Sequence, residues 1–265
     1  MENTVTEEAI DEALHDIQQR YMDGNALVQT REFGNPQVVR IAERHKHIRH
    51  KFLDGYAASE KIRKVIMSRQ VVRFLNIIFD RPAMAFQGLY FETGSQQVLH
   101  QDSAYVRLNR PMELAASWLA MEDIKPESGE LEYYVGSHRI KEYIFQGNSK
   151  WLPFNSDENP IFHRYVEEEC KRSNLKRARF LPKKGDALIW HADLVHGGSK
   201  ITQSATRRSF VTHWCPSTSE PSYFHYPPHS GKVKVSDTSY YCYSFHGHPA
   251  DPYLNMAGEI PKTRV

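Results

Sequence analysis

Five short runs rich in aromatic and β-branched residues occupy the middle of the chain, and they constrain its fold more than any other feature. They read AMAFQGLYFE, SWLAME, GELEYYV, DALIW and RRSFVTHW. Glycine, proline, asparagine and serine separate them, as is typical of short strands joined by turns. A single all-β barrel or sandwich of this chain length is common. We therefore expect a mainly β core over residues 84–216.

Helical patterns precede this core. Residues 4–21 place apolar side chains on one helical face, with a capping box at Thr4-x-x-Glu7. A second helical region begins near Ser59 and should end at Asp80-Arg81-Pro82, because proline lacks the backbone N–H that a helix interior needs. The apolar positions that define the two patterns are Ile10, Leu14, Ile17 and Tyr21, then Ile62, Val65, Ile66, Leu75, Ile78 and Phe79.

The chain reads as one domain over residues 1–265, because no flexible linker interrupts it. We expect a helical region over 1–83, the β core over 84–216 and an irregular tail over 217–265 that is rich in proline, tyrosine and histidine. A charged stretch of helical character, about 139–180, is expected as an insertion within the core. The predicted class is mainly β with N-terminal helices (α+β).

Composition excludes several functions. The chain is 40% hydrophobic and 25% charged, as folded globular proteins are, and a net charge of +2 provides no field for nucleic acid or an anionic membrane. Its three cysteines form no C-x-x-C pair, which argues against a disulfide framework or a cysteine zinc site. The first residues are acidic and lack the layout of a signal peptide, and no apolar stretch approaches 18 residues. We expect a cytoplasmic protein with a small-molecule partner and neither a nucleic-acid nor a membrane partner; the oligomeric state is not indicated.

Histidine is the residue type in excess, at 14, and one histidine stands in a pattern that suits a metal. His100-Gln101-Asp102 ends the strand-like run LYFETGSQQVLHQD, and residues i and i+2 of a strand project from one face. Two histidines with one carboxylate are typical ligands of non-haem Fe(II) oxygenases. About 0.6 His-x-Asp triplets are expected by chance in such a chain, and a second one, His191-Ala192-Asp193, is present. The neighbouring motifs must therefore decide between the two.

A second histidine and an arginine complete the pattern. His196 opens a Gly-Gly-Ser turn after a strand-like run, where the backbone can approach a ligand closely, while His191 is its rival as third ligand. Arg207 follows His196 by eleven residues at the start of RRSFVTHW, and side-chain alternation should send Arg208 to the solvated face. A buried guanidinium needs an anionic partner, for which a carboxylate is the natural choice. A metal with two open positions beside such an arginine suits a 2-oxo dicarboxylic acid.

Taken in order, these motifs resemble the phytanoyl-CoA dioxygenase family of Fe(II)/2-oxoglutarate-dependent oxygenases. The resemblance covers roughly residues 84–216 and rests on LHQDSAYV, Trp118, GELEYYVGSHR, KKGDALIWHADLVHGGSK and TRRSFVTHW. It implies that His100, Asp102 and His196 are the iron ligands and that Arg207 holds the distal carboxylate of 2-oxoglutarate. Gln101 and Trp118 match positions that line the co-substrate pocket. Two departures are Val135, where the family usually has proline before Gly-Ser-His, and Gly198, which leaves Ser199 as the candidate for a hydroxyl contact to the co-substrate.

The resemblance also implies a fold and an activity. The fold is a double-stranded β-helix, a jelly-roll or cupin-like barrel. The activity is hydroxylation of an unactivated C–H bond of a small molecule, with Fe(II), 2-oxoglutarate and O2 as cofactors and co-substrates, ascorbate as a helpful addition in vitro, and succinate and CO2 as co-products. Related enzymes that halogenate lack the carboxylate, so Asp102 favours hydroxylation. The alternatives are desaturation, cyclisation or C–heteroatom cleavage by the same iron chemistry, and a non-catalytic jelly-roll binding protein.

The remaining histidines and basic residues have simpler interpretations. His138 fits a core or loop histidine rather than a ligand. The pairs His225/His229 and His246/His248 lie in Pro- and Tyr-rich sequence that offers no strand or helix to fix a second metal site. The basic run 44–51 is expected to be a solvated face, although it could attract an anionic substrate.

Overall fold

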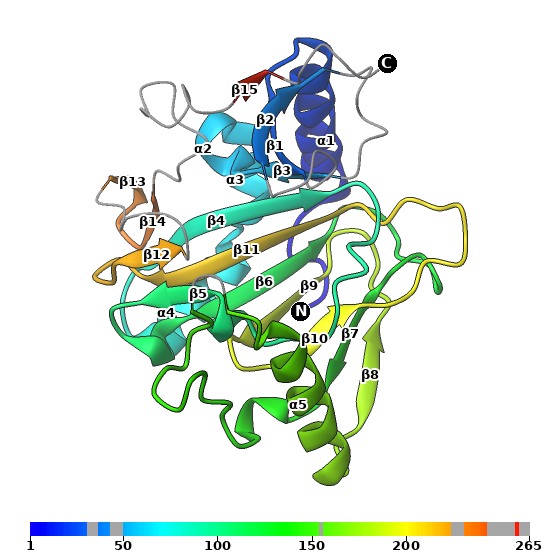
Figure 1. Cartoon of the computed structure of the whole chain (residues 1–265). Coiled ribbons are helices and arrows are strands. Elements are labelled where there is room, and N and C mark those ends of the chain that lie inside the picture. Colours follow the sequence, from blue (N-terminus) through cyan, green and yellow to red (C-terminus); the bar gives the residue numbers. More distant parts are fainter. Residues whose placement is uncertain (31–36, 43–49, 154–155, 224–230, 243–257, 260–265) are drawn as a thin grey trace.

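The computed structural model describes residues 1–30, 37–42, 50–153, 156–223, 231–242 and 258–259. Strands make up most of this part of the chain, and helices pack against them (Figure 1). A large sheet has the order β15-β2-β1-β3-β4-β11-β6-β9, and the β13–β14 hairpin joins it by pairing β14 with β4. Its strands are β1 Ala26–Thr30, β2 Gln37–Ile41, β3 His50–Leu53, β4 Ala83–Phe91, β6 Ala115–Ala120, β9 Ala187–His191, β11 Ser209–Pro216, β13 Lys232–Ser236, β14 Ser239–Cys242 and β15 Gly258–Glu259.

Two smaller sheets complete the β structure. One has the order β10-β7-β8, and the other pairs β12 with β5. Their strands are β5 Val106–Leu108, β7 Leu131–Tyr134, β8 Arg177–Phe180, β10 His196–Gly198 and β12 Pro221–Tyr223. Trp118 of β6 and Trp190 of β9 pack with Leu131 of β7, so an apolar layer fills the space between the large sheet and the β10-β7-β8 sheet. This two-sheet, mainly antiparallel arrangement is the jelly-roll class, although hydrogen bonds among the described strands do not close it into a continuous barrel.

Helices cover the opposite face of the large sheet (Figure 1). They are α1 Glu7–Met22, α2 Gly55–Ala58, α3 Glu60–Ile66 and α4 Arg69–Phe79. Ile17 of α1 and Leu75 of α4 belong to one buried cluster with Phe210 and Trp214 of β11. The N-terminal helices therefore fix the position of β11 from behind, while its other face remains available for a site.

The main elements expected from the sequence are confirmed, with corrections at their ends. The five aromatic runs form β4, β6, β7, β9 and β11. The first helix begins at Glu7 with Thr6 as its N-cap, and Thr4 instead donates its hydroxyl to the Gly185 carbonyl, so the predicted capping box is wrong. The second helical region ends as predicted, with Asp80 in the left-handed conformation before the proline. Ile78 is half exposed and is not part of the buried face.

Strands also occur where none was expected. β1, β2 and β3 lie within the region expected to be helical. β1 pairs with both β2 and β3, and β3 also pairs with β4, so each short apolar run becomes a strand through its partners in the sheet. The tail contributes β12, β13, β14 and β15. The charged insertion contains helix α5, Asn159–Arg172, followed by β8. Among the described residues, no helix is both long and apolar enough to span a bilayer.

Candidate active site

Three buried side chains meet between the two sheets. His100 and His196 form an isolated antiparallel bridge, in which each backbone N–H donates to the other residue's carbonyl, at 2.9 and 3.0 Å. Asp102 follows two residues after His100 and begins the short 3₁₀ helix η2, Asp102–Ala104. Among the described residues, these three form a group whose metal-ligating atoms all lie within 4.8 Å of one another. The candidate ligands named from the sequence are thus brought together.

The route to this convergence differs from the one expected. β4 ends at Phe91, so His100 and Asp102 do not share the face of one strand. Instead the bridge to β10 places His100, and the turn of η2 brings the Asp102 carboxylate beside both rings. The glycine after His196 makes this possible, since a Cβ on Gly197 would lie 2.7 Å from the Gln97 carbonyl oxygen. His196 lies in strand β10 itself rather than opening a turn.

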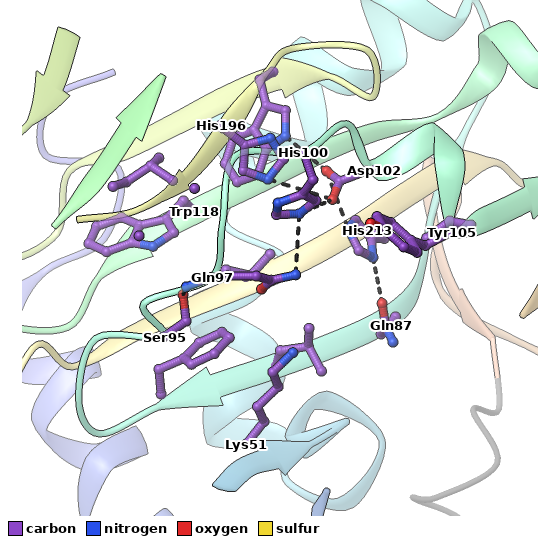
Figure 2. A pocket seen from close by; sticks show the side chains of 18 of the residues that line it. Lys51, Gln87, Ser95, Gln97, His100, Asp102, Tyr105, Trp118, His196 and His213 are labelled. Carbon is purple, nitrogen blue, oxygen red and sulfur yellow. Dashed lines mark hydrogen bonds and ion pairs between the residues drawn. The ribbon is translucent and has the colours of Figure 1, made fainter. Parts of the chain in front are cut away.

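The ring nitrogens that face Asp102 can bind a metal. The Nδ1 atoms of His100 and His196 lie 2.8 and 2.9 Å from the carbonyl oxygens of Val98 and Leu194. A carbonyl can only accept, so each Nδ1 carries the proton and each Nε2 keeps its lone pair. Both Nε2 atoms lie 3.6 Å from the same Asp102 Oδ1 (Figure 2). With bonds of about 2.1 Å on one octahedral face, neighbouring donors lie about 3.0 Å apart, so each 3.6 Å separation of Nε2 from Oδ1 has to shorten by only about 0.6 Å.

The second oxygen of Asp102 accepts one hydrogen bond and lies near another ring nitrogen. The Trp190 indole Nε1 donates to Oδ2 at 3.0 Å, and His213 Nε2 lies 3.5 Å from the same atom. Burial would raise the pKa of Asp102, but its interactions with the nearby His196, His213 and His100 outweigh burial and hold the pKa well below its usual range. For His196, burial disfavours the protonated imidazole and lowers its pKa to about 4. An ionised carboxylate beside a neutral imidazole is the protonation state that a divalent cation requires.

Arg207 lies deep in the cavity beside these ligands. It precedes β11, donates its backbone N–H to the Glu92 carbonyl at 2.9 Å, and is only 3% exposed. Its guanidinium lies 5.5 Å from the ring centroids of both Phe91 and Trp118, and Nη1 donates to the Ser209 hydroxyl at 3.0 Å. Burial lowers its pKa to about 10, so it remains a cation at neutral pH. Among the described residues, it forms no ion pair within 4.0 Å.

The neighbouring arginine has the opposite environment. Arg208 is partly exposed and pairs with Glu92 at 2.9 Å, as strand alternation predicted. The inner cavity, of about 180 Å³, is lined by Arg207, Trp118 and the three candidate ligands. Arg207 Nε and Trp118 Nε1 are buried nitrogens that lack a hydrogen-bond partner in the described structure. Two such donors at one cavity indicate a site built for an anionic or carbonyl-bearing ligand.

Two candidate co-substrate contacts lie elsewhere. The Gln101 amide donates to the Asp193 carbonyl at 2.6 Å, and the Ser199 hydroxyl donates to Glu130 Oε2 at 2.7 Å. Neither side chain lines the inner cavity. In this conformation both groups are engaged in buried hydrogen bonds that support the walls of the site.

The second His-x-Asp triplet forms a separate polar cluster. The Asp193 carboxylate accepts from Ser103 and from Lys150, the latter at 2.9 Å, and the Asp193 backbone N–H donates to His191 Nδ1 at 3.1 Å. His138 lies beside His191, with ring centroids 6.0 Å apart. The four tail histidines His225, His229, His246 and His248, and most of the basic run 44–51, lie outside the described residues.

His213 was missed by the sequence analysis. It is 6% exposed, lines the inner cavity and places Nδ1 2.6 Å from Gln87 Oε1 (Figure 2). The signal that could have found it is alternation along one strand, since Arg207 and His213 are six residues apart and therefore project from the same face. No local motif marks it, because its partners Asp102 and Gln87 are more than one hundred residues away in the sequence.

The fold and the site together define a jelly-roll protein in which two buried histidines and one carboxylate are placed so that they could hold a metal ion. A family model described as phytanoyl-CoA dioxygenase (PhyH) matches residues 2–209. The chain belongs to this family.

Relatives support the same family. Peroxisomal phytanoyl-CoA dioxygenase of Homo sapiens is 29% identical over 123 residues, which are 45% of this chain and 33% of the relative. The enzyme of Mus musculus is 20% identical over 171 residues, 61% of this chain and 48% of the relative. The chain thus spans between a third and a half of the length of these curated relatives.

Solved structures share the fold at low identity. The non-haem α-ketoglutarate-dependent epimerase SnoN from nogalamycin biosynthesis superposes with a TM-score of 0.60 at 14% identity, covering 91% of each chain. The carbocyclase SnoK from the same biosynthesis gives a TM-score of 0.56 at 16% identity, covering 82% of this chain and 76% of SnoK. HygX from Streptomyces hygroscopicus, with nickel and 2-oxoglutarate bound, gives 0.53 at 14% identity and covers 82% of each. At these identities the likeness establishes the fold, and the reaction must be argued from the site.

Proposed function

We propose that the protein is a non-haem Fe(II)- and 2-oxoglutarate-dependent dioxygenase that hydroxylates an unactivated C–H bond of a small molecule. One observation carries the proposal: two imidazole lone pairs and one carboxylate oxygen converge in a buried cavity. That cavity also contains an arginine that has no ion-pair partner in the part of the chain that the structure describes. His100, Asp102 and His196 would hold the iron. Iron in such a site supplies the activation of O2, coupled to oxidative decarboxylation of the 2-oxo acid.

The residues around the metal position divide the remaining tasks. Arg207 would bind the distal carboxylate of 2-oxoglutarate through two N–H groups, and Trp118 Nε1 would donate a further hydrogen bond. Trp190 keeps the Asp102 carboxylate oriented. The apolar wall of Trp118 and Phe91 excludes water from the co-substrate.

The reaction balances without another reductant. The substrate R–H, 2-oxoglutarate and O2 give R–OH, succinate and CO2, so one oxygen atom enters the alcohol and the other enters the new carboxylate of succinate. The structural relatives named as an epimerase and a carbocyclase have the same fold, and therefore the outcome depends on the position of the substrate carbon. The Asp102 carboxylate favours hydroxylation over halogen transfer, because it fills the position that a halide would need.

The test is succinate formation. Purified protein with Fe(II), ascorbate, O2 and 2-oxoglutarate should form succinate slowly without substrate and faster with a correct one. Asp102→Ala should abolish this reaction, whereas Asp123→Ala, which removes an exposed carboxylate paired with Lys183, should not. Unchanged succinate formation by Asp102→Ala would refute the ligand assignment. Absence of succinate across a broad substrate panel would favour a non-catalytic binding protein.

A further inference from the structure

A second and larger cavity adjoins the inner one. Its volume is about 640 Å³, within the range of roughly 300–1,000 Å³ typical of small-molecule sites. The two cavities share walls at Lys51, Phe91, Gln97 and His100, so a molecule in the outer cavity lies beside the metal position. Figure 2 shows the Gln97 amide next to the His100 ring, 3.3 Å from its Nε2, and Lys51 extending toward them from the same side.

The wall of the outer cavity is polar and carries no carboxylate among the described residues. Its hydrogen-bonding side chains come from β1, β3, the segment after β4, and α5; they include Gln29, Lys51, Ser95, Gln97, Asn159 and His163. Val98 is the one aliphatic side chain in the described wall. A cavity with this composition favours a ligand that forms hydrogen bonds over one that is mainly hydrocarbon.

Lys51 gives the cavity its charge. It lies in β3 next to the buried Phe52, and alternation places its side chain on the opposite, cavity-facing side of the strand. Its ammonium lies 5.6 Å from the ring centroid of Phe91, and the Arg207 guanidinium lies 5.5 Å from the same centroid. Lys51 and Arg207 thus place positive charge on the shared wall at Phe91, which favours an anionic ligand over a cationic one.

A three-residue cluster forms the wall on the α5 side. The Tyr105 hydroxyl donates to Asn159 Oδ1 at 2.7 Å and lies 2.7 Å from His163 Nε2. Because the hydroxyl proton is used on Asn159, the hydroxyl accepts from His163 Nε2–H, which leaves His163 Nδ1 as an acceptor. Asn159 and His163 are one helical turn apart and share one face of α5. The Tyr105 ring also meets the His100 ring edge-on at 5.8 Å, so this cluster reaches the metal position.

These groups determine which substrate the cavity can accept. An apolar chain gains about 0.8 kcal/mol for each buried CH2 group. It also removes water from polar groups without replacing their hydrogen bonds, at about 1–3 kcal/mol for each group left unpaired. A hydroxylated ligand restores those bonds and so avoids the loss.

We propose that the outer cavity is the substrate site and that it takes a small hydroxylated acid, whose carboxylate or phosphate binds Lys51 while its hydroxyl groups bind Gln97 and the Asn159–His163 face of α5. The proposal rests on the function proposed above and narrows its substrate class. It departs from the curated relatives, which are named for phytanoyl-CoA.

Calorimetry on the full chain tests this directly. Protein loaded with Ni(II) and 2-oxoglutarate is titrated with four probes: gluconate, glucose 6-phosphate, hexanoate and glucitol. Gluconate and hexanoate have the same chain length and charge, and glucitol keeps the hydroxyl groups without the charge. At least one of the two hydroxylated acids should bind tenfold or more tightly than both hexanoate and glucitol. Tighter binding of gluconate would identify a carboxylate as the group that Lys51 binds, and tighter binding of glucose 6-phosphate would identify a phosphate.

Variants identify the groups responsible. Lys51→Met should lower the affinity for the tighter-binding hydroxylated acid at least tenfold without changing the affinity for 2-oxoglutarate. Asn159→Leu should reduce the ratio between the affinity for that acid and the affinity for hexanoate. Lys183→Met removes an exposed lysine that lines neither cavity and should change nothing. Tighter or equal binding of hexanoate, no binding of either acid, or loss of 2-oxoglutarate affinity in Lys51→Met would each overturn the substrate proposal. Failure of wild-type protein to bind 2-oxoglutarate would instead count against the proposed function.

Discussion

Replacing Arg207 with methionine should make the ligand-free protein more stable while it weakens 2-oxoglutarate binding. The guanidinium is 3% exposed, and burial lowers its pKa from 12.5 to about 10. At about 1.4 kcal/mol for each tenfold change, this corresponds to about 3 kcal/mol of folding free energy lost at neutral pH. The pKa of Arg207 is lower in the folded than in the unfolded protein. The loss of folding free energy is therefore fully present below pH 10, where Arg207 is protonated in both states. It disappears as the pH rises toward 12.5.

Favourable contacts recover part of this cost. The guanidinium lies over Phe91 and Trp118, and such contacts contribute about 0.5–2 kcal/mol each. Methionine loses them but fills similar space without a charge. The net expectation is a gain of about 1 kcal/mol in the free energy of unfolding, which for a chain of this size raises Tm by about 3 °C.

The same substitution should weaken the binding of 2-oxoglutarate, although it stabilises the ligand-free protein. Hydrogen bonds to charged groups contribute about 1.5–3 kcal/mol each, so the loss of two should weaken 2-oxoglutarate binding by at least about 3 kcal/mol, roughly 150-fold. At a concentration one hundred times the wild-type Kd, 2-oxoglutarate should stabilise the wild type by about 2.7 kcal/mol and the variant by about 0.3 kcal/mol.

Urea unfolding of metal-loaded protein with and without 2-oxoglutarate measures both effects. Arg208→Met is the matched control: it removes an ion pair with Glu92 at the surface, should cost no more than about 1 kcal/mol, and should leave the ligand-induced stabilisation intact. Two results would refute a co-substrate role for Arg207: destabilisation of the ligand-free protein by more than about 1 kcal/mol in Arg207→Met, or full retention of the stabilisation by 2-oxoglutarate. Either would make the guanidinium a structural group.

Two further substitutions test how the metal ligands are held. Trp190→Phe removes the 3.0 Å indole hydrogen bond to Asp102 and should lower Ni(II) affinity about 10–100-fold in calorimetry, with little change in Tm; unchanged affinity would mean that the indole does not orient the carboxylate. Gly197→Ala introduces a Cβ 2.7 Å from the Gln97 carbonyl oxygen, which should push β10 away from the segment before His100. It should abolish tight Ni(II) binding while circular dichroism shows a folded chain, and retained tight binding would contradict this account.

The parts of the fold that were predictable are those with a local cause. The five aromatic runs became strands because their β-branched and aromatic residues match a half-buried pleated surface. The proline at position 82 ended α4 because it cannot donate a hydrogen bond. By contrast, β1 and β3 depend on pairing with segments elsewhere in the chain, which no local pattern specifies.

The site shows the same division. His100, Asp102, His196 and Arg207 were grouped from motif order, and the structure brings all four to one cavity. Their geometry was not predictable, because it depends on a backbone bridge between residues 96 positions apart and on the turn of η2. The outer cavity is even harder to predict from the sequence, because β3 and the inserted helix α5, which are far apart along the chain, each supply part of its wall.

Strand β11 explains why the N-terminal helices matter to a site in which they supply no candidate ligand. On one face it carries Val211 and His213 to the inner cavity, directly after Arg207. On the other face Phe210 and Trp214 are buried against the helical layer. A cavity in that layer would let β11 shift, and the shift would reach the guanidinium and the His213 ring together. The helices thus contribute to the proposed chemistry by fixing one strand, and substitutions in their packed face should alter co-substrate affinity and metal affinity in parallel.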